Sequence, residues 1–271
     1  MKFGLILSLD YEIFGNGSGS VLDHVINPTN EILEICERNN FKLTIMFEVC
    51  EYWSFKYAEQ QGLLNDLDYS PSELMEKQIK KAVLAGHDVQ LHTHPQWLNS
   101  DYINGNWELN FDQWKLSDLP YSNSSSESSN TILSVLRRGK HTLEELLRSV
   151  NKDYECIAYR AGSWCIQPEK SIIKAMKNVG IGIDSSVFQG GSSEGLSSYN
   201  YESAPYSIGY WWTGSEDVCK VGSSNENILE APIQTLRMPF YKNYSFKKLS
   251  SLFKSKLNSS TGRGSYSASH N

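Results

Sequence analysis

The sequence predicts an α/β fold built on a parallel sheet, and three observations support this. Segments with the pattern of a strand alternate with segments that have the pattern of a helix along most of the chain. Several strand segments end in a polar or charged side chain, as expected where the carboxyl ends of parallel strands form an active-site face. The 271 residues are enough for one large domain, and an α/β barrel is possible at this size.

Six segments carry the pattern of a strand. Residues 2–9 form an unbroken apolar run, which is typical of a strand that is covered on both faces. Apolar side chains alternate in residues 41–49, and a third apolar stretch around Val89 and Leu91 leads into a pair of histidines. The remaining expected strands are residues 155–159, 180–183 and 228–233.

Four helices are expected between these strands, at residues 28–39, 71–85, 142–150 and 168–179. The second has the clearest boundaries, because Ser70 is a suitable N-cap, Pro71 suits the first helical position and Gly86 ends the helix. The start of the third is placed at Thr142, which opens a capping box with Glu145.

Two histidines, His92 and His94, close the third strand at positions i and i+2. Residues two apart in a strand point to the same face, so both imidazoles are expected to project together. Pro95 then ends the strand because it cannot donate to a ladder. Two neutral imidazoles converging at a strand end supply most of a divalent metal site. The alternative is a surface loop with unrelated histidines, but polar groups also gather at other strand ends, namely Asp10, Glu12, Arg160 and Asp184.

Composition argues against several classes of protein. The net charge of −6 is unlike that of a general nucleic-acid binder, which is usually basic. The five cysteines form no C-x-x-C pair and are odd in number, which favours reduced thiols in the cytoplasm over a disulfide framework. The apolar run from Phe3 to Leu7 is too short for a signal-peptide core or a membrane span. We therefore expect a cytoplasmic protein with no transmembrane segment and no nucleic-acid partner.

With these residues in view, the chain resembles the polysaccharide deacetylase (NodB-homology, carbohydrate esterase 4) superfamily. It is most similar to the intracellular branch associated with surface-polysaccharide biosynthesis, and the resemblance covers roughly residues 3–240. The motifs that carry it are Ser8-Leu9-Asp10-Tyr11-Glu12, the histidine segment, Tyr159-Arg160-Ala161-Gly162 and Ile183-Asp184-Ser185-Ser186. The resemblance implies a deformed (β/α) barrel of about seven strands.

The resemblance also implies a metal site. Glu12 would be the acidic ligand and His92 the first histidine ligand. The family usually places its second histidine four residues after the first, where this chain has Gln96. His94 is therefore the expected second ligand, and Gln96 is the weaker substitute. Zn²⁺ suits two imidazoles and a carboxylate, although other first-row divalent ions bind the same set.

Three residues are expected to be catalytic by the same resemblance. Asp10 would be the general base, and Arg160 would pair with it and keep it ionised. Arg160 could instead pair with Asp184, which belongs to the fourth motif. The family pattern also asks for a general-acid histidine on a late strand, but no histidine stands between His141 and His270.

Aromatic side chains near these motifs are candidates for contact with substrate, because aromatic faces can stack on sugar rings. Trp97 and Trp164 are more often core residues than sugar platforms. Tyr210 and Trp211 lie in a Gly-, Ser- and Tyr-rich segment with little else to bury, so a substrate-groove role is expected for them, with local packing as the alternative. The expected substrate-binding residues are Gln96, Trp97, Trp164, Tyr210 and Trp211.

Two regions are expected, a catalytic domain over residues 1–240 and a basic, Ser-rich segment over residues 241–271. The missing late histidine and the count of six strands predict a barrel that is incomplete at its C-terminal end. We expect an open seam between the strand at 228–233 and the first strand, which would leave strand edges exposed.

The function implied by the resemblance is metal-dependent N-deacetylation of an N-acetylated sugar, free or lipid-linked, in lipopolysaccharide O-antigen or capsule biosynthesis. A divalent metal would polarise the amide carbonyl and lower the pKa of bound water toward ~7. Two alternatives remain open. One is hydrolysis of another non-peptide C–N amide bond, and the other is a catalytically silent glycan-binding protein. The oligomeric state is also left open.

Overall fold

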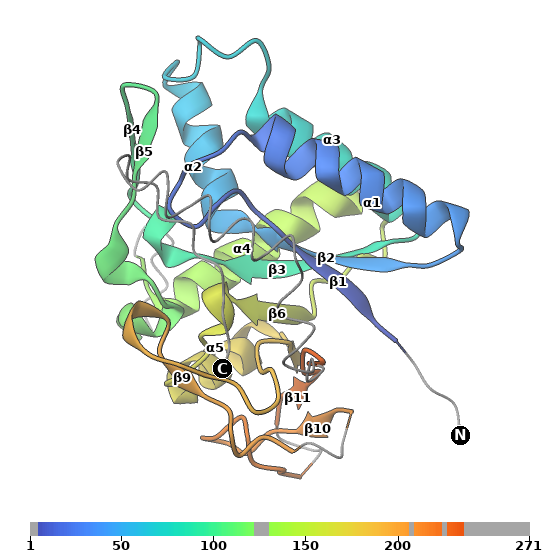
Figure 1. The fold of residues 1–271 in the computed structure, drawn as a ribbon, viewed down its shortest axis with the longest axis vertical. Coiled ribbons are helices and arrows are strands. Elements are labelled where there is room, and N and C mark those ends of the chain that lie inside the picture. The colour runs from blue at the N-terminus through green and yellow to red at the C-terminus, as the bar shows by residue number, and fades with distance from the viewer. Residues whose placement is uncertain (1–4, 122–129, 206–208, 224–226, 236–271) are drawn as a thin grey trace, which may run out of the picture. The chain divides into compact units, whose positions relative to one another are not determined.

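The computed structural model describes residues 5–121, 130–205, 209–223 and 227–235 (Figure 1). The chain divides into a compact unit, Met1–Ile233, and a second unit, Gln234–Asn271. The sheet, the helices and the candidate site all belong to the first unit. The expected domain boundary at residue 240 and the histidine at position 270 lie outside the described residues.

A seven-stranded, mostly parallel sheet organises the first unit (Figure 1), which confirms the predicted α/β class. Its order is β1-β2-β3-β6-β7-β11-β10. Every neighbouring pair is parallel except β10 and β11, which are antiparallel. The strands are β1 Leu7–Tyr11, β2 Leu43–Glu48, β3 Asp88–Thr93, β6 Ala158–Ala161, β7 Ile183–Asp184, β11 Leu229–Glu230 and β10 Trp211–Trp212.

The sheet is open among the residues that the structure describes. β1 and β10 stand at its two edges, and no pairing joins them into a barrel. The open seam was expected between β11 and β1. This position is wrong, because β10 pairs with the far side of β11 and forms the sheet edge there. β10 was not predicted, because its two residues lie in a Gly/Ser-rich segment without an alternating pattern.

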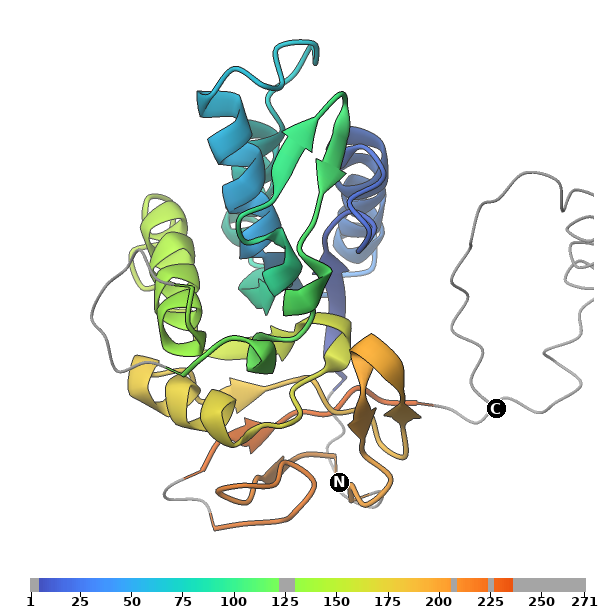
Figure 2. The same ribbon diagram turned by 90° about the vertical axis from the view of Figure 1, so that its left-hand side faces the viewer.

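Five α-helices of the described residues accompany the sheet. α2, α3 and α4 contact β3, and α4 also packs along α5 (Figure 2). No helix in the described ranges is both long and apolar enough to cross a membrane. The helices are α1 Asn27–Arg38, α2 Val49–Gln60, α3 Pro71–Leu84, α4 Ile132–Arg148 and α5 Lys170–Val179.

Shorter elements connect these helices and strands. The minor strands are β4 Asp101–Ile103, β5 Asn106–Glu108, β8 Ser192–Ser193 and β9 Tyr199–Asn200. The short helical turns are η1 Leu22–Ile26, η2 Pro95–Trp97, η3 Phe111–Gln113, η4 Leu116–Asp118, η5 Gly162–Trp164 and η6 Gly195–Ser197.

The predicted caps of α3 are confirmed, whereas the predicted start of α4 is wrong. The Ser70 side chain accepts a hydrogen bond from the backbone N–H of Glu73, and Gly86 follows the helix with φ of 82°. α4 begins ten residues earlier than expected, where Thr131 and Ser134 cap it reciprocally. Thr142 therefore lies inside this helix, and the start predicted there is wrong.

Two larger elements, α2 and the β4–β5 hairpin, are also among those that were not predicted from the sequence. The buried side chains of α2 include Glu51 as well as apolar residues. Its sequence therefore lacks the helical spacing of apolar residues by which an amphipathic helix is predicted. The β4–β5 hairpin lies between β3 and α4, in a segment for which no element was predicted. Its turn, Asn104-Gly105, has positive φ at both positions (51° and 80°), and this Asn-Gly pair is the signal that could have revealed it.

Candidate metal centre

The carboxyl ends of β1, β2, β3 and β6 meet at one edge of the sheet because these strands run parallel. β3 is buried from Val89 through Thr93, so its end is held rigidly. β3 ends at Thr93 and a 3₁₀ turn begins at Pro95, so the strand ends before this proline, as predicted. The imidazole centroids of His92 and His94 lie 4.9 Å apart, which confirms that the two rings project together.

Glu12 completes a cluster with the two histidines. Its Oε2 lies 3.6 Å from His92 Nε2 and 3.1 Å from His94 Nδ1. One ligand atom from each residue falls within a group no wider than 4.8 Å. Both histidines are buried, and the Glu12 side chain is 22% exposed. A carboxylate and two imidazoles in this arrangement could hold a divalent metal ion.

Two atoms of this cluster support that interpretation. Glu12 Oε2 and His92 Nε2 are buried and make no hydrogen bond of regular geometry, although Glu12 Oε2 lies within ion-pair distance of both imidazoles. Leaving such polar atoms unpaired costs free energy, and coordination of a metal would use both. His92 Nδ1 donates to the backbone carbonyl of Arg160 (2.8 Å), which leaves Nε2 as the atom that can ligate.

The charges around His92 favour a cation at this point. Burial alone would lower its pKa, but the carboxylates of Asp10 and Glu12 raise the pKa of His92 to about 10. Burial would likewise raise the pKa of Glu12, yet His94 and His92 hold it below its usual value. A metal ion would therefore displace a proton from His92, so binding should release protons.

His94 is held from its far side by the turn after β6. The backbone N–H of Ser163 donates to His94 Nε2 (3.1 Å), so in this arrangement the ring proton lies on Nδ1, toward Glu12. A neutral imidazole carries one proton, so a metal at Nδ1 would require that proton on Nε2. The contact with Ser163 would then have to open. Ser163 and Trp164 both adopt the left-handed region (φ 51° and 58°), a conformation that stores strain in non-glycine residues.

Asp10 lies beside this cluster and forms the predicted ion pair. Arg160 Nη1 donates to Asp10 Oδ1 at 2.6 Å, and the guanidinium is nearly fully buried. Its other donors contact Ser8 Oγ and both the Oγ and the carbonyl of Ser185. Burial would raise the pKa of Asp10, but His92 and Arg160 outweigh it and keep that pKa below its usual value. Asp10 is therefore an ionised carboxylate in a fixed orientation.

Asp184 does not belong to the site surface. It is fully buried and accepts hydrogen bonds from the Oγ (2.7 Å) and backbone N–H (3.3 Å) of Ser186. Ser186 Oγ in turn accepts from the backbone N–H of Ala161 at the end of β6. The expected catalytic contact is therefore wrong, because a carboxyl that is 0% exposed cannot reach a substrate. Asp184 instead supports the strand end that carries Arg160.

Two buried acids behind the cluster were not predicted. Glu48 Oε1 caps α2 by accepting from the backbone N–H of Cys50 (2.7 Å) and Glu51 (3.2 Å). Glu51 accepts from the backbone N–H of Ile13 and so fixes the chain directly after Glu12. Burial, together with the charges of Glu12 and Glu48, raises the pKa of Glu51 well above its usual value. The E-x-x-E spacing after a strand is the signal that could have placed both.

The expected substrate-binding residues divide into two groups. Gln96 is buried beside the cluster, with Nε2 3.4 Å from His94 Nδ1 and an Oε1 that has no partner. Trp164 is half-buried on the turn after β6. Trp97 and Trp211 are 1% and 3% exposed, so these two assignments are wrong, because neither ring can offer a face to a sugar. Tyr210 is exposed but adjoins β10, at the sheet edge remote from β3.

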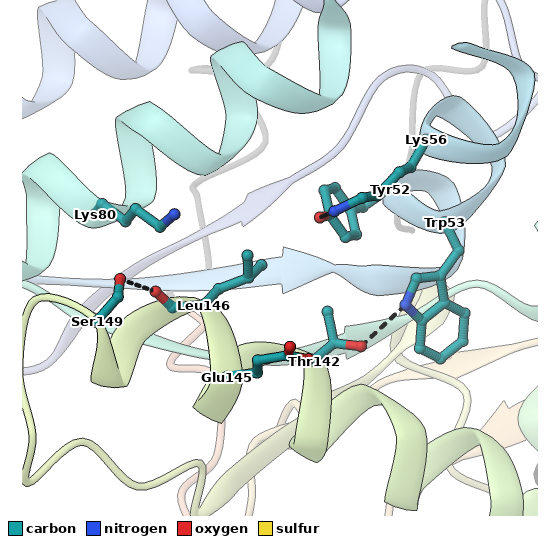
Figure 3. Close-up of a pocket in the computed structure, with 8 residues that line it drawn as sticks. All are labelled: Tyr52, Trp53, Lys56, Lys80, Thr142, Glu145, Leu146 and Ser149. Carbon is teal, nitrogen blue, oxygen red and sulfur yellow. Dashed lines mark hydrogen bonds between the residues drawn. The ribbon is translucent and has the colours of Figure 1, made fainter. Parts of the chain in front are cut away.

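A separate hollow of about 350 Å³ lies between α2, α3 and α4 (Figure 3). Its polar groups are already paired. Trp53 Nε1 donates to Thr142 Oγ1 (3.1 Å), and Lys56 Nζ lies 2.9 Å from Glu76 Oε1. None of the three clustered ligands lines it. The strand-end cluster is therefore the better candidate site.

No protein-family model matches the chain, and neither the curated proteins nor the solved structures contain a significant match to it.

Proposed function

We propose that the protein is a metal-dependent carbohydrate N-deacetylase that uses Zn²⁺ held by Glu12, His92 and His94. The observation that carries this proposal is the position of the cluster beside an ionised, ion-paired aspartate. Asp10 precedes Glu12 by two residues and is fixed by Arg160. A metal site with a carboxylate base next to it is the minimal equipment for hydrolysis of an unreactive amide.

Each residue has a chemical task in this proposal. The acetamide carbonyl is a poor electrophile, and a bound divalent metal supplies polarisation of its oxygen and acidification of a water molecule. Asp10 takes the proton of the attacking water. Arg160 keeps Asp10 ionised and aimed, through the bond at 2.6 Å. The residue that protonates the departing amine is left unassigned.

The substrate class follows from the sequence motifs and from the surroundings of the site. The resemblance to polysaccharide deacetylases favours an N-acetylated sugar, free or on a lipid-linked glycan, in cytoplasmic assembly of O-antigen or capsule. The half-buried indole of Trp164, on the turn that touches His94, is consistent with contact to a sugar ring.

The direct test measures zinc content and acetate release together. The zinc-loaded protein is incubated with methyl glycosides of N-acetylglucosamine and N-acetylgalactosamine and with lipid-linked N-acetylhexosamine. Acetate should appear, and His92→Ala should lose both zinc and acetate release. His141→Ala is the control, because this histidine is exposed on α4 and should be dispensable. Acetate release from none of these substrates by the zinc-loaded protein would refute the deacetylase proposal and favour a silent glycan-binding protein.

A further inference from the structure

We infer that the indole of Trp114 forms a wall of the candidate site and stacks on the sugar ring of the substrate. This rests on the proposed function, because it states which part of an N-acetylated sugar this wall would hold. No sequence motif points to Trp114. It lies between the short turns η3 and η4, in a segment for which no element was predicted.

Trp114 touches both segments that carry metal ligands. Its ring centroid is 6.4 Å from that of His94, with 33° between the planes. Its Cη2 would be 3.6 Å from a Cβ placed on Gly15, three residues after Glu12. Among the ring contacts of the described residues, this is the contact that joins a ligand histidine to a tryptophan. A group attached to an amide at the cluster would therefore lie next to this indole.

The ring is fixed before any ligand arrives. Trp114 Nε1 donates to Ser197 Oγ at 2.8 Å, and Phe111 packs at 5.9 Å between centroids. The next residue, Lys115, donates through Nζ to Ser198 Oγ (3.1 Å), which ties the same two segments together again. The indole nevertheless remains only half-buried. A preorganised aromatic face loses little conformational entropy on binding, which suits a recognition surface.

The other aromatic candidates are less well placed. Trp97 and Trp211 are buried. Tyr210 adjoins β10, the fourth strand from β3, or about 19 Å away along the sheet at the usual strand spacing. The indole of Trp164 already makes an edge contact with the ring of Phe188, with 5.5 Å between the centroids, so part of its surface is covered.

The flat, apolar face of an indole favours a substrate that carries a sugar ring. One face of a pyranose presents C–H groups, while its hydroxyls point outward from the ring edge, so it can lie flat on an aromatic surface. A small amide such as a formamide or a ureide would leave Trp114 uncovered. The wall therefore distinguishes a sugar amide from the smaller C–N substrates that the motifs alone leave open.

The test compares Trp114→Ala and Trp114→Phe with the wild-type chain, all loaded with zinc. One substrate is methyl N-acetylglucosaminide, and the other is S-ethyl thioacetate, an acetyl donor without a ring. Trp114→Ala should raise KM for the sugar roughly 10-fold, as expected for loss of one aromatic contact, and leave thioacetate hydrolysis unchanged. Trp114→Phe should retain most of the affinity. Zinc content should be equal in all three proteins.

Trp53→Ala is the matched control. Trp53 is also a half-buried indole whose Nε1 bonds a hydroxyl, but it lies in the hollow of Figure 3. It should leave KM unchanged. An unchanged sugar KM in Trp114→Ala, or an equal loss on both substrates, would overturn the inference while the deacetylase proposal stands. If the wild type hydrolyses no amide, that proposal fails, and the inference is decided by calorimetric binding of the glycoside to wild type and Trp114→Ala.

Discussion

Substitution of Gly162 by alanine should remove the metal site without changing any ligand. A Cβ at this position would lie 2.0 Å from His94 Cδ2 and 2.6 Å from both His94 Nε2 and the carbonyl oxygen of Thr93. Gly162 is not among the glycines with positive φ, so alanine can adopt its backbone conformation. The conflict is therefore steric, and it falls most severely on the His94 imidazole and also on the backbone carbonyl of Thr93.

The size of the effect follows from these distances. Real Cβ atoms essentially never approach another heavy atom within 3.0 Å, so a contact of 2.0 Å forces the new Cβ and the His94 ring apart by at least 1.0 Å. Metal–ligand distances tolerate only about 0.2 Å. Loss of a residue that merely supports a ligand costs about 10- to 100-fold in metal affinity, so displacement of His94 itself should cost at least about 100-fold.

Zinc titration against a competing chelator measures this effect, and Gly139→Ala provides the control. A Cβ at Gly139 would lie 2.6 Å from Leu91 Cδ1 and 3.1 Å from Val49 Cγ2. It would therefore overpack the contact of α4 with β3 and α2, and none of these nearest atoms belongs to the cluster. Both variants should lose roughly 1–3 kcal/mol of stability, but only Gly162→Ala should lose zinc affinity. A folded Gly162→Ala protein with wild-type affinity would show that His94 is not a ligand and would turn attention to Gln96.

Three further predictions concern the groups around the cluster. Asp10→Asn should retain zinc and lose turnover by ~10²–10⁴, the usual contribution of a general base. Arg160→Lys should also retain zinc but shift the acidic limb of the pH–rate profile to higher pH, because one ammonium cannot replace the fork that lowers the pKa of Asp10. Burial and the charge of Asp184 raise the pKa of Glu230 well above its usual 4.5, so the folded chain holds a proton that the unfolded chain releases. The stability of the wild-type chain therefore falls as the pH rises, whereas a glutamine at this position does not titrate. Glu230→Gln should therefore gain in melting temperature over wild type between pH 5 and pH 8.

Each of these predictions has a contrary outcome. Loss of zinc in Asp10→Asn would make Asp10 a ligand. An unmoved acidic limb in Arg160→Lys would separate the ion pair from the ionisation of the base. A constant difference in melting temperature between Glu230→Gln and wild type across the pH range would mean that Glu230 titrates alike in the folded and unfolded chain.

The clustering of the site could be predicted because it depends on local periodicity and on one topological rule. The i, i+2 spacing of His92 and His94 sets their common face, and Pro95 sets the strand end. The rule that parallel strands share a carboxyl edge then brings Glu12 and Arg160 to the same place. These inferences need no knowledge of how helices pack.

What the sequence did not reveal depends on contacts between distant segments. Nothing in the sequence distinguishes Glu48 from an exposed acid at the end of a strand, because its burial and its bond to the backbone of Cys50 depend on packing. Ser163 approaches His94 only because a strained turn ends β6. The burial of Trp97 and Trp211 and the partial exposure of Trp114 likewise follow from packing, since an aromatic side chain in an irregular segment suits either place.

The most direct test of the account is a crystal structure of the zinc-soaked protein with anomalous data at the zinc absorption edge. One anomalous peak should appear within about 2.0–2.2 Å of Glu12 Oε2, His92 Nε2 and His94 Nδ1, with Asp10 close by but not coordinated. A zinc-saturated crystal with no peak at these three atoms, or with its peak elsewhere, would contradict the central claim.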